Sequence, residues 1–157
     1  MANTYTKIHI QTVFAVQNRN CVIRKSWKEE LYKYITGTIQ NYDHKLLAIN
    51  GMPDHVHLFF GMRTTQSISD LMKEVKGYSS KFINDNGFTK NQFSWQEGYG
   101  AFSYSKSDVD KVINYIKNQE KHHKTKTFTE EYLEFLHKFE IPYDERYIFK
   151  PIDYDPE

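Results

Sequence analysis

The spacing of apolar residues alternates between strand-like and helical along the chain, and it predicts a series of elements. Strands are indicated where β-branched and aromatic residues cluster, at residues 5–16, 45–52, 55–61 and 93–104. Helices are indicated where apolar residues recur at helical spacing, at residues 26–42, from Ser67 onward, from Ser107 to about Lys121, and near 129–138. The resulting order is β-α-β-β-α-β-α, followed by the short last helix.

Six of these elements match, in order, the ferredoxin-like arrangement that RRM domains also use. We therefore predict an α+β fold in which an antiparallel sheet carries helices on one face. At 157 residues the chain suits a single domain with a substantial core. We place that domain at residues 1–126 and interpret residues 127–157 as an acidic C-terminal tail that carries the short helix.

Charge is distributed unevenly, although the net charge of the chain is only +1. Residues 1–126 contain 18 Lys and Arg against 11 Asp and Glu, whereas residues 127–157 contain 3 against 9. A basic body favours a polyanionic partner such as nucleic acid. The acidic tail could cover part of that surface or face solvent. Aromatic residues make up 16% of the chain, so some rings remain available to stack on bases.

Several classes of protein are excluded by what the sequence lacks. No apolar run approaches the roughly 20 residues of a membrane span, and the first residues lack the apolar core of a signal peptide. Cys21 is the only cysteine, which excludes an internal disulfide and a thiolate metal cluster. No P-loop motif is present, so we expect no nucleotide cofactor. A cytoplasmic protein without a membrane partner fits these features best.

Two short motifs carry the candidate chemistry. His55 and His57 flank Val56 within an apolar run, and alternate residues of a strand project from the same face. Tyr115 and Gln119 are spaced i, i+4 and would share one face of the predicted helix. Two imidazoles, an amide and a phenol suit metal-assisted phosphoryl transfer with tyrosine as the nucleophile. Each motif also has an ordinary explanation: a solvent-facing histidine pair, a boundary tyrosine and a solvated glutamine.

The two motifs resemble the signatures of single-tyrosine HUH transposases, the enzymes of insertion-sequence-200-like elements and their REP-associated relatives. The resemblance rests on PDHVHL at residues 53–58 and YIKNQ at residues 115–119. Further similarity is found in KGYSS at 76–80 and FSWQEGY at 93–99, and the likeness extends over roughly residues 5–125. The motifs occur in the expected order, and their joint occurrence is far more specific than any one of them.

The resemblance implies a site, a substrate and a reaction. His55, His57 and Gln119 would bind one divalent ion, Mg or Mn. Tyr115 would attack a phosphodiester of single-stranded DNA that carries a hairpin, leaving a 5′-phosphotyrosine and a free 3′-hydroxyl. The protein would then be a DNA transposase that cleaves and rejoins DNA ends. Insertion-sequence members act as homodimers whose active sites are completed in trans, which we expect here, whereas REP-associated relatives can act as monomers.

The residues expected to contact DNA are basic, hydroxyl-bearing or aromatic, and they lie around the same motifs. They are Lys73, Lys76, Ser79, Ser80, Lys81, Trp95, Tyr99, Lys117 and Lys121. Asp54 is expected to form a turn or to support a neighbouring group, while His122 and His123 fit helix-end capping and exposure. No general base is evident in the sequence.

Three other interpretations stay open. The chain could be a REP-associated or domesticated enzyme that performs the same chemistry on chromosomal repeats. It could be a non-catalytic module that binds single-stranded nucleic acid on the same fold through stacking rings and a basic face. It could also be a metal-dependent nuclease that uses water and therefore leaves no covalent adduct.

Overall fold

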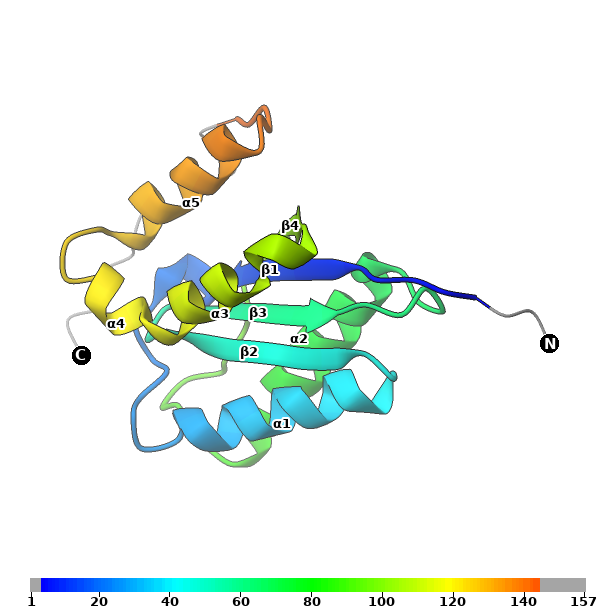
Figure 1. Ribbon diagram of the computed structural model, residues 1–157. Helices are drawn as coiled ribbons and strands as arrows, with labels where there is room; N and C mark the ends of the chain where they lie inside the picture. The colour runs from blue at the N-terminus through cyan, green and yellow to red at the C-terminus, as the bar shows by residue number, and fades with distance from the viewer. Residues whose placement is uncertain (1–3, 145–157) are drawn as a thin grey trace.

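A four-stranded antiparallel sheet forms the centre of the protein (Figure 1). The computed structural model describes residues 4–144. The strands are β1 (His9–Ala15), β2 (Lys45–Met52), β3 (His55–Gly61) and β4 (Gly100–Tyr104), in the order β2-β3-β1-β4. Every neighbouring pair is antiparallel. The predicted α+β class and antiparallel sheet are confirmed, and the strand order is compatible with the ferredoxin-like arrangement.

Two long helices cover one face of this sheet. In Figure 1, α1 (Lys28–Asn41) lies below the strands and α2 (Ile68–Asp85) lies behind them, and the two helices contact each other. The side chains of Val56, Leu58 and Phe60 in β3 pack into the same hydrophobic core as residues from both helices. Because side chains alternate along a strand, the other residues of β3 must face the opposite side of the sheet.

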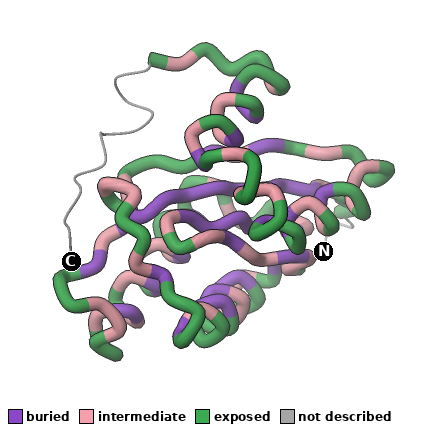
Figure 2. Tube along the Cα trace, turned by 90° about the vertical axis from the view of Figure 1, so that its left-hand side faces the viewer, coloured by how far each residue is buried: buried purple, intermediate pink, exposed green. Residues whose placement is uncertain are grey.

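The C-terminal part of the chain covers that opposite side. In Figure 1, α3 (Val109–Lys117) crosses in front of the strands, α4 (Gln119–His122) lies beside their left-hand end, and α5 (Phe128–Lys138) lies above them. α3 packs Ile116 against Phe59 of β3. α5 packs against β1 and β4 through three apolar residues, Phe128, Phe135 and Leu136. Helices therefore lie on both faces of the sheet, and Figure 2 shows buried positions along the strands between them.

The starts of α2 and α5 are fixed by side-chain caps. The Ser67 hydroxyl accepts a hydrogen bond from the backbone N–H of Asp70 at 3.0 Å. The Thr127 hydroxyl accepts from the backbone N–H of Glu130 at 3.2 Å. The predicted short helix is thereby confirmed, with its first residue one position earlier than expected.

The prediction of one continuous helix over residues 107–121 is wrong. This segment consists of the 3-10 turn η2 (Lys106–Asp108), then α3, then α4 after an interruption at Asn118. The Asn50 amide in β2 donates to the backbone carbonyls of Ile116 and Lys117 at 3.0 and 3.2 Å. These end-of-helix carbonyls are thus satisfied without a further helical turn.

Other boundaries follow the predictions in part. The strands predicted at 45–52 and 55–61 are confirmed, whereas the first strand begins only at His9 and is followed by the 3-10 turn η1 (Gln17–Arg19). Within the predicted strand 93–104 only the end is β4, and residue 95 forms an isolated bridge with Val16. Residues 145–157 of the predicted acidic tail lie outside the described residues. No helix within residues 4–144 has both the length and the apolar character of a membrane span.

Candidate active site

The paired imidazoles of β3 lie on the sheet face that α3 and α5 cover. His55 and His57 are both fully buried, and their ring centroids lie 5.0 Å apart. Val56 between them points into the opposite core, as the alternation predicts. The hairpin needs a glycine at position 51, because a Cβ there would collide with the backbone carbonyl of His55.

Each imidazole is held from behind by a second polar side chain. His55 Nδ1 donates to Asp54 Oδ1 at 2.7 Å, so Asp54 has the supporting role that was one of its two expected ones. Gln11 Nε2 donates to His57 Nδ1 at 3.0 Å, and the Tyr104 hydroxyl donates to Gln11 Oε1 at 3.0 Å. These contacts direct both Nε2 atoms into one space. An acceptor such as the Asp54 carboxylate, which receives the second N–H of the ring, orients metal-binding histidines.

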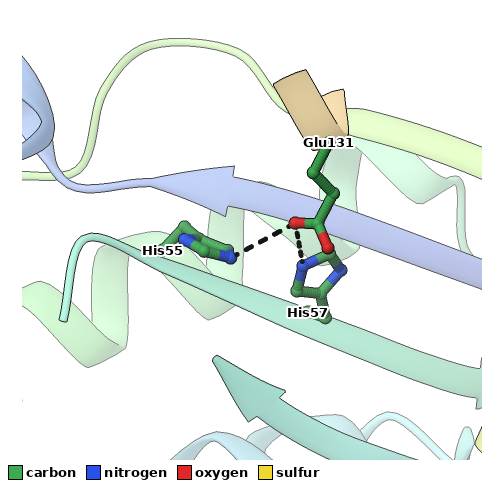
Figure 3. Close-up of side chains that lie close together, drawn as sticks. All are labelled: His55, His57 and Glu131. Carbon is green, nitrogen blue, oxygen red and sulfur yellow. Dashed lines mark hydrogen bonds and ion pairs between the residues drawn. The ribbon is translucent and has the colours of Figure 1, made fainter. Parts of the chain in front are cut away.

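A carboxylate from α5 fills the space between the two rings (Figure 3). Glu131 is 1% exposed, and its Oε1 lies 3.0 Å from His57 Nε2 and 3.5 Å from His55 Nε2. These ligand atoms all lie within 4.8 Å of one another, an arrangement that could hold a metal ion. Glu131 lies in the segment predicted to be an acidic tail, and it was not among the predicted site residues. A signal existed, since Glu131 shares a helix face with Phe128 and Phe135 and is therefore a charged residue on an apolar stripe.

The nucleophile candidate and the predicted amide ligand meet at the same carboxylate. Gln119 is fully buried, and its Oε1 lies 3.2 Å from His55 Nε2. Gln119 Nε2 donates to Glu131 Oε2 at 3.1 Å, and the Tyr115 hydroxyl donates to that same oxygen. The structure therefore brings all four predicted residues together within one chain, despite the interruption between α3 and α4.

Burial and hydrogen bonding act on these groups in different directions. Burial by itself would lower the pKa of His55, but hydrogen bonds to Asp54 and Glu131 outweigh it and raise the pKa to about 9. For His57 burial dominates, and the pKa is lowered. Burial opposes the charge on Glu131, yet its imidazole partners hold its pKa far below the ordinary value. Burial and the adjacent carboxylate raise the pKa of Tyr115 well above its ordinary value, so the phenol is neutral.

Two depressions give access to this region. A pocket of about 370 Å³ opens on Tyr115 and Glu131 and is also lined by Lys111 and Lys138. A larger groove of about 900 Å³ lies between α1, β2 and the α3–α4 segment. Its lining is predominantly basic: Lys28, Lys33, Lys117, Lys121 and Lys124 against Glu29 and Glu120. The smaller pocket reaches the chemistry, whereas the groove offers a surface for phosphates.

The residues predicted to contact DNA are distributed over both sides of the sheet. Lys117 and Lys121 are exposed beside the site, whereas the α2 residues lie on the face away from Tyr115. The exposed or partly exposed members of the α2 group are Lys73, Lys76, Ser80 and Lys81. Tyr99 is exposed in the loop before β4.

Three of the predicted DNA contacts have structural partners instead of a free surface. Lys76 Nζ donates to the backbone carbonyls of Gln96 and Gly98 at 2.7 and 2.8 Å. Ser79 is buried, and its hydroxyl accepts from Trp95 Nε1 at 2.9 Å. These contacts hold the loop that precedes β4 against α2, and contact of these residues with DNA stays a prediction.

The residues present fit a divalent metal ion. Imidazole nitrogens and amide and carboxylate oxygens converge on one buried space, and the second nitrogen of each paired imidazole is hydrogen-bonded from behind. Transition metals accept such mixed donors, and supporting hydrogen bonds of this type accompany metal-binding histidines. The phenol of Tyr115 reaches the same space through Glu131.

Comparison with known proteins identifies the family. The chain matches the family model of IS200-like transposases over residues 4–119, a region that ends at Gln119 and contains neither His123 nor Glu131. The search of curated proteins returns no match.

Two solved structures share the fold. A protein of Deinococcus radiodurans R1 assigned as a transposase has a TM-score of 0.62 and 22% identity, over 76% of this chain and 95% of that one. A REP-associated tyrosine transposase bound to a REP hairpin has a TM-score of 0.58 and 17% identity, over 78% of this chain and 73% of that one. With the family model covering most of its length, this chain belongs to the IS200-like transposases.

Proposed function

We propose that this transposase cleaves and rejoins single-stranded DNA at hairpin-bearing ends through a 5′-phosphotyrosine at Tyr115. A divalent ion, Mg or Mn, is held by His55, His57 and Gln119 together with Glu131. One observation carries the proposal: the Tyr115 hydroxyl donates to the carboxylate that also bonds the paired imidazoles. The nucleophile and the metal-binding group thus share one buried residue.

The reaction forms one bond to phosphorus and breaks another. The Tyr115 oxygen bonds to the phosphorus, the bond to the 3′ oxygen breaks, and that oxygen leaves as a hydroxyl after taking up a proton. A bound divalent ion neutralises charge on the phosphate and stabilises the departing oxygen. Glu131 Oε2 is placed to receive the phenolic proton, because it already accepts that hydrogen bond. In rejoining, a 3′-hydroxyl attacks the phosphotyrosine, so no nucleotide is consumed.

Glu131 also accounts for the control of the nucleophile. In the metal-free chain burial and the carboxylate raise the pKa of Tyr115, and a neutral phenol is a weak nucleophile. A divalent ion bound at the site would compensate the negative charge of Glu131. The pKa of Tyr115 would then be raised less, because a nearby negative charge disfavours a phenolate. Glu131 therefore couples activation of Tyr115 to occupation of the metal site.

The complete site within one chain supports action by a monomer, the mode expected of a REP-associated or domesticated enzyme acting on chromosomal repeats. The homodimer with sites completed in trans would require α3 and α4 to pair with the sheet of another subunit, and it stays a prediction. One solved relative is bound to a REP hairpin. We extend that class of ligand to this chain, with Lys117 and Lys121 of the basic groove as phosphate contacts.

The test is formation of a covalent protein–DNA species. The full chain is incubated with a labelled single-stranded hairpin oligonucleotide and Mg²⁺ or Mn²⁺, and SDS-stable complexes are resolved on a gel. We expect an adduct with the native chain, none with Tyr115→Phe, and a severe reduction with His57→Ala while hairpin binding persists. Light scattering of the same samples gives the mass and so separates monomer from dimer.

Tyr34→Phe is the matched control, because Tyr34 stacks on Phe82 on the opposite side of the sheet. It should form as much adduct as the native chain. An adduct with Tyr115→Phe would exclude the nucleophile assignment. Cleavage without any adduct would identify a nuclease that uses water, and hairpin binding without cleavage would identify a non-catalytic module.

A further inference from the structure

His123 is brought into the site although its sequence position suggested only helix capping and exposure. It follows Gln119 by four residues, and its side chain is only 8% exposed. Its Nε2 lies 3.2 Å from Glu131 Oε1 and 3.1 Å from Gln119 Oε1. Its ring centroid lies 4.9 Å from that of His55. A third imidazole therefore faces the same two oxygens as His55, and one of these, Glu131 Oε1, is also the partner of His57.

The separations between these donor atoms have the size of the edges of a coordination polyhedron. From Glu131 Oε1 the distances to Nε2 of His57, His123 and His55 are 3.0, 3.2 and 3.5 Å. From Gln119 Oε1 the distances to Nε2 of His123 and His55 are 3.1 and 3.2 Å. Ligands held about 2.0–2.1 Å from one metal ion, at tetrahedral to octahedral angles, are about 2.8–3.4 Å apart. Four of the five distances fall in that interval, and the separation of Glu131 Oε1 from His55 Nε2, at 3.5 Å, is slightly longer.

In the structure these separations are bridged by hydrogen bonds. Imidazole N–H groups donate to the carboxylate and amide oxygens, so protons occupy the space in which a cation would sit. The hydrogen-bonded arrangement and a metal-bound arrangement need the same nitrogen and oxygen atoms in the same places. A purely structural histidine would need only one of these partners, whereas His123 faces both oxygens.

We propose that His123 is a further protein ligand of the divalent ion, so that three imidazoles and two oxygens surround it and favour a first-row transition metal over Mg²⁺. This inference rests on the metal site of the proposed function. Mg²⁺ takes oxygen ligands and keeps much of its water, whereas imidazole suits ions of the transition series. A donor set of three nitrogens, an amide oxygen and a carboxylate oxygen therefore selects against Mg²⁺ by chemistry and not by cavity size.

The test measures metal binding without DNA. The full chain is stripped with a chelator and titrated with Co²⁺, whose visible absorption reports the number and type of its ligands, and separately with Mn²⁺ and Mg²⁺ by calorimetry. For His123→Ala we expect at least about a tenfold weaker Co²⁺ affinity and an altered Co²⁺ spectrum. For the native chain we expect Mn²⁺ to bind at least about tenfold more tightly than Mg²⁺.

Two further variants make the result decisive. His137→Ala changes an exposed imidazole that contacts Tyr143 away from the site and should retain the native affinity and spectrum. His123→Gln can still hydrogen-bond but removes the nitrogen ligand, and circular dichroism of each metal-free variant reports its fold. If His123→Ala fails to fold, His123→Gln decides.

Native Co²⁺ affinity and spectrum in His123→Gln would overturn the ligand assignment, and equal affinity for Mg²⁺ and Mn²⁺ would overturn the selectivity. Metal binding as expected but no DNA adduct would instead refute the proposed function and leave this inference standing. Absence of any metal binding by the native chain would refute both.

Discussion

Glu131 and His57 lie 3.0 Å apart across 74 residues of sequence, and both are buried. The imidazole comes from the middle of the sheet and the carboxylate from the last described helix. Their contact places a charged group of α5 directly in the candidate active site. The C-terminal segment, expected from sequence to be an appendage, therefore supplies part of the chemistry.

Replacement of Glu131 by Gln should impair the site more than the fold. The glutamine side chain has one acceptor oxygen, whereas the carboxylate has two, so it cannot accept hydrogen bonds from several imidazoles. We therefore expect a loss of about 1–3 kcal/mol in the free energy of unfolding. Adduct formation should fall at least about tenfold, because Tyr115 loses its proton acceptor and the ion loses a ligand. Urea unfolding and the adduct gel measure the two effects.

Glu134→Gln is the control on the same helix, since Glu134 is exposed and pairs with Lys126 at 2.6 Å. Exposed pairs of this kind contribute little to stability. If Glu131→Gln and Glu134→Gln reduced adduct formation equally, the reduction would be due to the overall charge of α5 and not to Glu131 itself.

Replacement of Gln11 by Leu should weaken metal binding through His57. Gln11 contacts His57 Nδ1, and the Tyr104 hydroxyl fixes the amide from its other side. Loss of a partner that orients a metal-binding histidine typically costs about 10–100-fold in affinity. Co²⁺ titration measures the change. Thr12→Val, at the adjacent buried position of β1, provides a comparison, and an equal loss there would show a general disturbance of the strand.

Metal affinity should rise with pH up to about 9. In the metal-free chain the pKa of His55 is raised to about 9, so below that pH a proton must leave before the nitrogen can bind a metal. The apparent affinity should therefore increase about tenfold per pH unit and level off above pH 9. Calorimetric titrations with Mn²⁺ at intervals of about one pH unit, from about pH 6 to about pH 8, measure how steeply the affinity rises with pH.

Asp54→Asn tests the cause of that dependence. Asp54 is one of the two partners that raise the pKa of His55, so its neutralisation should move the levelling-off to lower pH. An unchanged pH profile in this variant would show that the proton in competition with the metal is not on His55.

Replacement of Asn50 by Ala should destabilise the end of α3. The Asn50 amide satisfies two backbone carbonyls where α3 stops, and its loss should cost about 1 kcal/mol in the free energy of unfolding. Because Gln119 follows directly, the metal affinity should fall as well. Asn114→Ala, at an exposed position of the same helix, should change neither quantity, and a native metal affinity in Asn50→Ala would show that α4 is positioned independently.

The sequence by itself determined most of the sheet and the paired imidazoles. The strand containing His55 and His57 has strong β-forming residues and a period of two, and this local pattern suffices to place both rings on one face. Tyr115 and Gln119 were identified by motif resemblance, since their helical spacing alone is common to many surface residues. The continuous helix predicted around them failed because Asn50, from a distant strand, caps α3.

Only the tertiary structure decided which polar groups join the imidazoles. The apolar stripe of α5 indicates that Glu131 faces a buried surface, but it does not indicate that this surface is the one that carries the paired imidazoles. His123 likewise lies beside His122 at an ordinary helix end. The position of Glu131 arises from the docking of α5 through Phe128, Phe135 and Leu136, a non-local apolar contact. Local patterns fix which face a side chain occupies, whereas the meeting of two faces depends on packing between distant segments.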